Sequence, residues 1–85
     1  MNHHATPDFW KLYQQLPLEI QALASKNFEL LKRNSRHPSL KLKKINEYWT
    51  ARVGLKYRAV AIQKGDDVIW FWIGSHAEYD ELLKL

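Results

Sequence analysis

The chain has 85 residues and no cysteine, which excludes a disulfide framework and a thiolate metal site. It lacks any apolar run near the roughly 18 residues that a transmembrane helix needs. Met1–Thr6 has none of the apolar character of a signal-peptide core. We therefore expect a cytoplasmic protein without a membrane span. The length allows a single domain over residues 1–85, with a thin hydrophobic core.

Acidic residues are almost absent from the middle of the chain. Glu47 is the single acid between Leu30 and Lys64, where ten residues are basic: Lys32, Arg33, Arg36, Lys41, Lys43, Lys44, Arg52, Lys56, Arg58 and Lys64. The other eight acids lie before or after this stretch. Such a segment indicates a surface that faces a polyanion, nucleic acid above all, and a solvated basic face without a partner fits the charge equally well.

The N-terminal third has the pattern of two helices. Thr6-Pro7-Asp8 is typical of a helix start, because Thr caps, Pro fits the first helical position and an acid favours the first turn. Apolar residues then recur at helical spacing on both sides of Pro17: Phe9, Leu12, Tyr13 and Leu16, then Ile20, Leu23, Ala24, Phe28 and Leu31. This pattern predicts a helical hairpin with one apolar face, which ends near Asn34.

From Leu40 onward the apolar period changes to two, which predicts strands. We expect strands at 40–43, 49–53, 57–63 and 68–73, and a short edge strand within residues 1–6. Lys44 breaks the alternation and would mark a bulge. Trp70 and Trp72 would share one strand face, where core packing is favoured over stacking with bases.

The last segment begins with a capping-box pattern, with Ser75 as the cap and Glu78 at the third helical position. It predicts a short helix over about residues 76–84. The predicted fold is therefore α+β, in which the N-terminal helical hairpin packs on one face of a small antiparallel sheet and a short helix ends the chain. The opposite sheet face would stay partly open and could gather the basic residues.

Several segments occur in an order that resembles a known family. They are His37-Pro38-Ser39-Leu40-Lys41-Leu42-Lys43, Ala51-Arg52-Val53-Gly54, Tyr57-Arg58-Ala59, Trp70-Phe71-Trp72-Ile73-Gly74-Ser75-His76 and Tyr79-Asp80. Together they resemble the RelE/ParE toxins of bacterial toxin–antitoxin pairs. The resemblance implies a metal-independent ribonuclease fold without a cofactor. Many members cut messenger RNA in the A site of the 30S ribosomal subunit, and a cognate antitoxin wraps and silences the toxin.

The resemblance makes Arg58 the first candidate for stabilising the charged phosphate, because the family usually carries a catalytic Arg at the Tyr-Arg position. A guanidinium offers a planar fork to two phosphate oxygens, although a surface Arg that bridges to a carboxylate would have the same sequence. Arg52 could bind phosphate or pair with Glu47, and both interpretations stay open.

Four further basic residues are candidates for binding RNA phosphates: Lys41, Lys43, Lys44 and Arg36. Lys41 and Lys43 are two apart on the expected strand and would share a face. One of them could assist proton transfer. The alternative is a polar strand face without a partner.

His76 is the natural acid–base candidate, and Asp80, one helical turn later, could orient its imidazole. Tyr79 lies on the same helix face, and it is either catalytic or packed against Leu82 and Leu83. The alternative for His76 is a purely structural role at the helix start. His3 and His4 are neighbours at the chain start without a completing acid, so no metal site is predicted there.

The resemblance leaves three functions open. The first is an endoribonuclease that cleaves messenger RNA on the ribosome by attack of the 2′-hydroxyl. The second is a ParE-type inhibitor of DNA gyrase, and the third is an inactive RelE-like nucleic-acid-binding protein. Fold alone does not choose among them.

Overall fold

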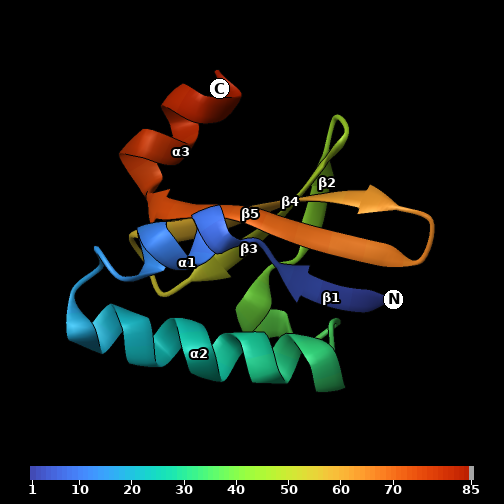
Figure 1. Cartoon of the computed structure of the whole chain (residues 1–85), viewed down its shortest axis with the longest axis horizontal. Coiled ribbons are helices and arrows are strands. Elements are labelled where there is room, and N and C mark those ends of the chain that lie inside the picture. Colours follow the sequence, from blue (N-terminus) through green and yellow to red (C-terminus); the bar gives the residue numbers. More distant parts are fainter. Residues whose placement is uncertain (85) are drawn as a thin grey trace.

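The computed structural model describes residues 1–84 and contains one five-stranded sheet with three α-helices (Figure 1). The elements are β1 (Asn2–Ala5), α1 (Pro7–Tyr13), α2 (Leu18–Arg33), the 3-10 helix η1 (Pro38–Leu40), β2 (Lys43–Ile45), β3 (Tyr48–Val53), β4 (Tyr57–Lys64), β5 (Asp67–Ser75) and α3 (His76–Leu83). The strand order is β1-β5-β4-β3-β2. No helix within residues 1–84 is long and apolar enough to cross a membrane.

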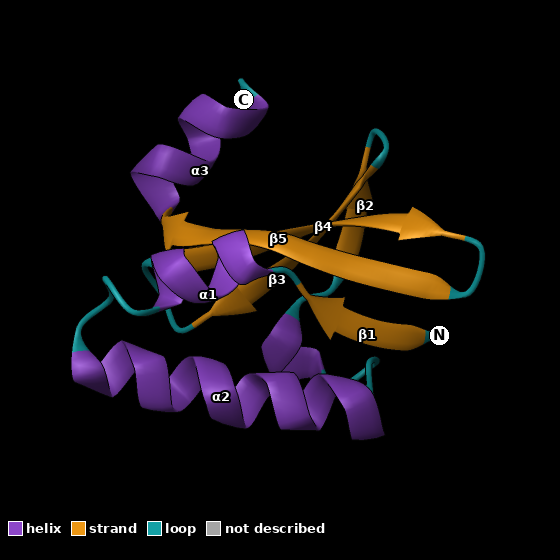
Figure 2. Cartoon of the chain, in the orientation of Figure 1, coloured by secondary structure: helices purple, strands orange, loops and turns teal. Residues whose placement is uncertain are grey.

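The sheet is antiparallel from β2 to β5, and β1 adds to β5 in parallel at the edge. The α2 helix covers one face of the sheet, while α3 stands on the opposite side at the end of β5 (Figure 2). The predicted α+β fold, with its N-terminal helix pair and short C-terminal helix, is confirmed. So is the short edge strand, although its parallel pairing makes the sheet mixed.

The predicted helix starts are confirmed by their caps. Thr6 Oγ1 accepts a hydrogen bond from the Phe9 N–H at 3.1 Å. At α3, Ser75 Oγ accepts from the Glu78 N–H at 3.2 Å, and the Glu78 carboxylate accepts from the Ser75 N–H at 3.1 Å. The bonds from the Ser75 backbone and side chain lower the pKa of Glu78, because they favour its charged form. The capping box therefore anchors the helix that follows the last strand.

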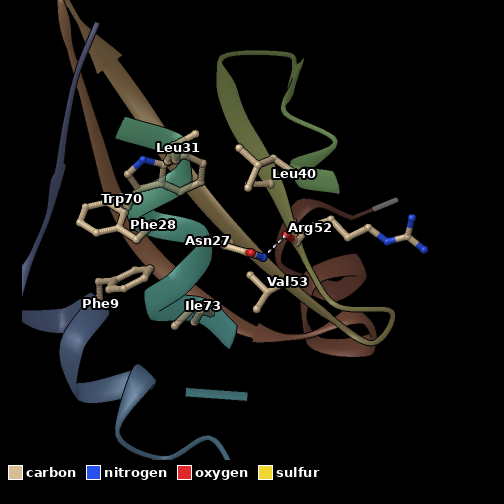
Figure 3. Close-up of a pocket in the computed structure, with 12 residues that line it drawn as sticks. Phe9, Asn27, Phe28, Leu31, Leu40, Arg52, Val53, Trp70 and Ile73 are labelled. Atoms are coloured by element: carbon tan, nitrogen blue, oxygen red, sulfur yellow. Dashed lines mark hydrogen bonds between the residues drawn. The ribbon is translucent and has the colours of Figure 1, made fainter. Parts of the chain in front are cut away.

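The core lies between the helices and the covered face of the sheet. Trp70 and Ile73 of β5 and Val53 of β3 are at most 4% exposed, and they pack with Phe9 and Leu31 from the helices. These side chains surround a cavity of about 30 Å³ (Figure 3), which is space for one water molecule. The main core cluster thus lies on one face of the sheet, while Val60 and Thr50, which are 0% and 2% exposed, are buried on the other face.

The edge strand β1 is held by its two histidines. Trp70 Nε1–H donates to His3 Nδ1 at 3.0 Å, and the His4 ring lies 2.9 Å from the Asp67 carboxylate. Burial is the main reason that the pKa of His3 is lowered, and the positive charges of the amino terminus and of His4 add to it. The hydrogen bond requires an unprotonated Nδ1, so a neutral His3 is part of the folded edge.

The strand predicted at 40–43 is wrong. Residues Pro38–Leu40 form a 3-10 turn instead, which His37 caps by accepting the Ser39 N–H at Nδ1, 3.2 Å away. Lys41 follows in the left-handed region, with φ of 47°, and β2 begins only at Lys43. Leu40 is 1% exposed, so the turn buries its side chain, and this burial outweighs the strand preference that the alternating sequence pattern indicated.

The bulge predicted at Lys44 is also wrong, because Lys44 pairs regularly with Trp49. The irregularity lies between β4 and β5 at Val60 and Ala61, opposite Phe71. Trp70 pairs with Ala61 and Trp72 with Val60. Since paired residues share a face, the two tryptophans lie on opposite faces, contrary to the prediction. Trp72 packs over Gly74, where an added Cβ would come within 2.6 Å of the ring.

Candidate nucleic-acid interface

A basic cleft lies on the sheet face opposite α2. It is bounded by α3 on one side and by β2 and β3 on the other, which rise from the same side of the sheet (Figure 1). The cleft has a volume of about 560 Å³ and is lined by Lys41, Leu42, Lys43, Ile45, Thr50, Ala51, Arg52, Arg58, His76, Tyr79 and Asp80. It therefore brings together residues from five segments of the chain.

The cleft is strongly cationic. Lys41, Lys43, Arg52 and Arg58 line it, and Asp80 is the single carboxylate among the lining residues. Within residues 1–84, none of these four cations forms an ion pair. Unpaired cations that converge on a concave surface attract and orient a polyanion.

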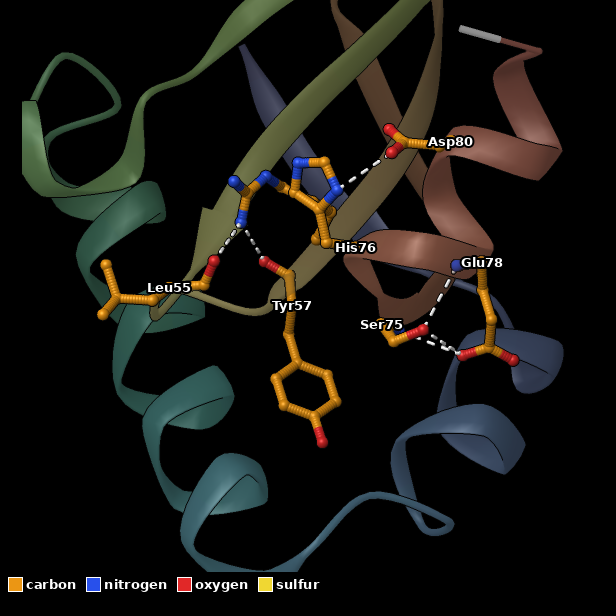
Figure 4. Close-up of polar contacts among 7 residues, drawn as sticks. Leu55, Tyr57, Ser75, His76, Glu78 and Asp80 are labelled. Atoms are coloured by element: carbon orange, nitrogen blue, oxygen red, sulfur yellow. Dashed lines mark hydrogen bonds and ion pairs between the residues drawn. The ribbon is translucent and has the colours of Figure 1, made fainter.

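Arg58 is fixed by the turn between β3 and β4. Its Nη1 donates to the carbonyl oxygens of Tyr57 at 2.8 Å and of Leu55 at 3.4 Å. Figure 4 draws these two hydrogen bonds to the Leu55 and Tyr57 carbonyls. Arg58 pairs directly with Arg52 across β3 and β4. The side chains of Arg52 and Arg58 therefore leave the same face of the sheet from opposed positions on two paired strands.

Arg52 is held at its backbone and lacks a partner at its side chain. Its carbonyl accepts a hydrogen bond from the Asn27 amide of α2 at 3.4 Å, while the side chain extends away from the core (Figure 3). Its Nε–H is buried and has no hydrogen-bond partner within the described part of the chain. The pair with Glu47 that the sequence left open does not form there.

The four lysine and arginine candidates for phosphate binding divide into two groups. Lys41 and Lys43 both line the cleft, although the reason differs from the predicted one, because the left-handed turn at Lys41 directs it there rather than strand alternation. Lys44 lies 5.8 Å from the Trp49 ring, in a cation–π contact outside the cleft. Arg36 is exposed in the loop after α2 and does not line the cleft either.

The first turn of α3 contributes His76, the candidate acid–base group of the cleft. His76 Nδ1 lies 3.1 Å from the Asp80 carboxylate, as Figure 4 shows, one helical turn apart. A neutral imidazole that donates Nδ1–H to Asp80 presents its Nε2 lone pair for proton transfer. Tyr79 is 4% exposed, and its ring meets the His76 ring edge-on at 5.8 Å between centroids. Tyr79 therefore supports the histidine by packing and also lines the cleft.

Sequence reasoning left Thr50 out of the candidate site. Thr50 is 2% exposed and donates from Oγ1 to the Lys43 carbonyl at 3.4 Å, which joins the two strands at the floor of the cleft. Thr50 lies two residues before Arg52 on the same strand, so strand alternation places both side chains on one face. That pattern could have identified Thr50 from the sequence. No group of three or more His, Asp or Glu side chains that could hold a metal ion occurs within residues 1–84.

No protein-family model and no curated protein sequence matches the chain. Solved structures do match.

A chain of the RelB–RelE antitoxin–toxin complex from Methanococcus jannaschii is 25% identical, with a TM-score of 0.68 over 92% of this chain and 95% of that chain. The YoeB/ParE toxin from Agrobacterium tumefaciens is 18% identical, with a TM-score of 0.66 over 89% of this chain and 99% of that one. The isolated RelE toxin of Escherichia coli is 16% identical, with a TM-score of 0.63 over 98% and 95% of the two chains.

These similarities cover nearly the full length of this chain and of each matched chain. They define the class of protein as a small α+β protein with the architecture of bacterial and archaeal toxins. The ordered motifs of the sequence agree with this class. By fold, the chain is similar to the RelE, YoeB and ParE toxins.

Proposed function

We propose that this protein is the toxin of a toxin–antitoxin pair and cleaves messenger RNA on the ribosome, in the cytoplasm, without a metal ion. The observation that carries the proposal is the combination, in one cleft, of the His76–Asp80 pair with four cations that form no ion pair within residues 1–84. A cationic cleft alone would bind any nucleic acid, whereas an oriented imidazole beside it supplies proton transfer.

The reaction that fits these groups is an internal transesterification. The 2′-hydroxyl oxygen attacks the adjacent phosphorus, its proton passes to a base, and the bond from phosphorus to the 5′-oxygen breaks. The leaving 5′-oxygen takes up a proton, which yields a 2′,3′-cyclic phosphate and a 5′-hydroxyl. We assign one of the two proton transfers to His76 Nε2 and the stabilisation of the charged phosphorane to Arg58 and Arg52. Lys41 and Lys43 hold the flanking phosphates.

We infer a protein partner from the structural relatives. Two of them are complexes of a toxin with its antitoxin: RelB–RelE from Methanococcus jannaschii and RelBE2 from Mycobacterium tuberculosis, which is 20% identical with a TM-score of 0.66. A cognate antitoxin that covers the basic cleft would silence the toxin, because it would neutralise the cations that the RNA needs.

The test is primer extension on a defined message in a purified translation system, with and without the protein. We expect new 3′ ends in register with the codons. Arg58→Ala should reduce the cleavage rate by about 10²–10³-fold, which is the usual effect of losing one donor to a transition-state anion. Lys26→Ala is the matched control, because it removes one exposed cation from α2, on the far side of the sheet.

Two results would contradict the proposal. An intact message and undisturbed translation would exclude the nuclease, and a gyrase supercoiling assay would then test the ParE-type alternative. Equal cleavage rates for the wild type and Arg58→Ala would show that the reaction does not take place in the basic cleft. If neither assay responds while the protein still binds RNA, the chain is an inactive nucleic-acid-binding member of the superfamily.

A further inference from the structure

The open sheet face carries a row of apolar side chains beside the basic cleft. The strand registers align Ile45 of β2, Tyr48 of β3, Ile62 of β4 and Ile69 of β5 across the sheet. Phe71, at the bulge in β5, lies 6.1 Å from Tyr48 between ring centroids, at an angle of 55°. All five side chains are half-buried rather than covered. An apolar row that the fold leaves accessible is available to an external partner.

This row lies on the same face as the cations. Tyr48, Thr50 and Arg52 alternate along β3, so their side chains project to one side of the sheet. Ile45 lines the cleft and pairs with Tyr48, so the apolar row is continuous with the cleft. Along β3, Tyr48 and Arg52 are four residues apart, which is about 13 Å of extended strand.

The charge around the row selects the occupant. Lys41, Lys43, Arg52 and Arg58 lie along one border of it, so a segment with regularly spaced negative charge and flat apolar groups fits best. A single-stranded nucleic acid has both features, since its phosphates follow a basic groove while its bases stack on aromatic rings. A purely apolar protein segment would leave the four cations unpaired.

We infer that Tyr48 and Phe71 form a base-stacking site for the single-stranded RNA whose phosphates occupy the basic cleft. The inference rests on the proposed function, which it extends by adding a subsite for unpaired bases. Stacking is tolerant of base identity, because every base has a flat π-face. This subsite would therefore select single-stranded over double-stranded RNA, without selecting a sequence.

The test uses a fluorescently labelled single-stranded oligodeoxynucleotide at low ionic strength, with binding measured by anisotropy. This probe has no 2′-hydroxyl and cannot undergo the proposed cleavage, so its binding is independent of whether the protein is a nuclease. A second set of probes carries one abasic site at each position in turn. An abasic site keeps the phosphate and removes only the stacking surface.

We expect abasic substitution at one or two positions to weaken wild-type binding by about 5- to 100-fold, the range for loss of one stacked base. Tyr48→Leu and Phe71→Leu should weaken the intact probe similarly and should no longer respond to the same abasic positions. Tyr48→Phe, which keeps the ring, should bind as the wild type does. Trp10→Leu is the control, because it removes a 38% exposed aromatic from α1, outside this face.

Three outcomes would overturn the inference. They are no detectable binding of the intact probe, equal binding of intact and abasic probes, and unchanged binding by both Leu variants. Circular dichroism and thermal unfolding of each variant separate loss of the ring from loss of the fold. A nuclease that passes the cleavage test but shows no abasic effect would keep its proposed function and lose the stacking site. A protein that stacks bases without cleaving messages would give the reverse result.

Discussion

The basic cleft makes a quantitative prediction about salt. Each cation that neutralises a phosphate of a single strand contributes about −0.7 to the slope of log Kobs against log salt concentration. Four cations line the cleft: Lys41, Lys43, Arg52 and Arg58. If all four contact phosphates, the slope for a short single strand is about −2.8. Arg58→Ala and Lys43→Ala should each make the slope shallower by about 0.7.

Two basic residues outside the cleft serve as matched controls. Lys44 and Arg36 were predicted from sequence to bind phosphates, yet neither lines the cleft. Lys44→Ala and Arg36→Ala should leave the slope unchanged, although each removes the same charge. The assay is a series of anisotropy titrations of the uncleavable oligodeoxynucleotide at several salt concentrations.

The comparison between the two groups decides the outcome. If the slope becomes shallower by the same amount in the cleft variants and in the control variants, the cleft is not the binding site. Such a result would indicate a diffuse attraction to the net charge of the protein. Arg58→Lys adds a further distinction: it should keep the slope, because the charge remains, and lose cleavage, because an ammonium cannot reproduce the guanidinium fork.

Three further predictions concern α3 and the sheet edge. Asp80→Asn should lower the cleavage rate by about 10–100-fold without weakening oligonucleotide binding, because it disturbs the orientation of His76, keeps the four cations and removes one negative charge from the cleft; single-turnover cleavage alongside anisotropy measures both. Ser75→Ala should cost about 0.5–2 kcal/mol in urea unfolding at neutral pH, because it removes the cap of α3, and unchanged stability would refute the role of the capping box. In acid, the Glu78 contribution, present above the ordinary carboxyl pKa of 4.5, should be lost as pH falls through its lowered folded pKa. His3 has a lowered folded pKa, so wild-type stability should fall as pH drops below 6.5, and His3→Asn should flatten this dependence; an equally steep profile in the variant would contradict the assignment.

The helices and the sheet were predictable because their signals are local. The caps at Thr6 and Ser75 depend on residues within three positions, and the helical stripes depend on residues within one or two turns. The pairing of β2 through β5 in chain order agrees with the general preference of consecutive strands to pair. The sequence signal for β1 was weak because this strand depends on pairing with β5, which lies more than sixty residues away.

The candidate site was predictable only in part. Arg58, Arg52 and His76 were named because they match the family motifs, and they line one cleft. Lys41 was named for a wrong reason, since its left-handed turn, and not a strand, points it at the cleft. Lys44 was named because charge density in sequence does not reveal the side of a hairpin on which a side chain lies.

The sequence by itself determined the fold class, the boundaries of the helices and the presence of a strongly basic middle segment, because these depend on composition and short-range periodicity. Only the tertiary structure decided which basic residues converge. The bulge opposite Phe71 changes the faces of Trp70 and Trp72, and the buried Leu40 sets the turn that directs Lys41. Both depend on packing between distant segments, because a shift of one residue in a strand moves each following side chain to the other face of the sheet.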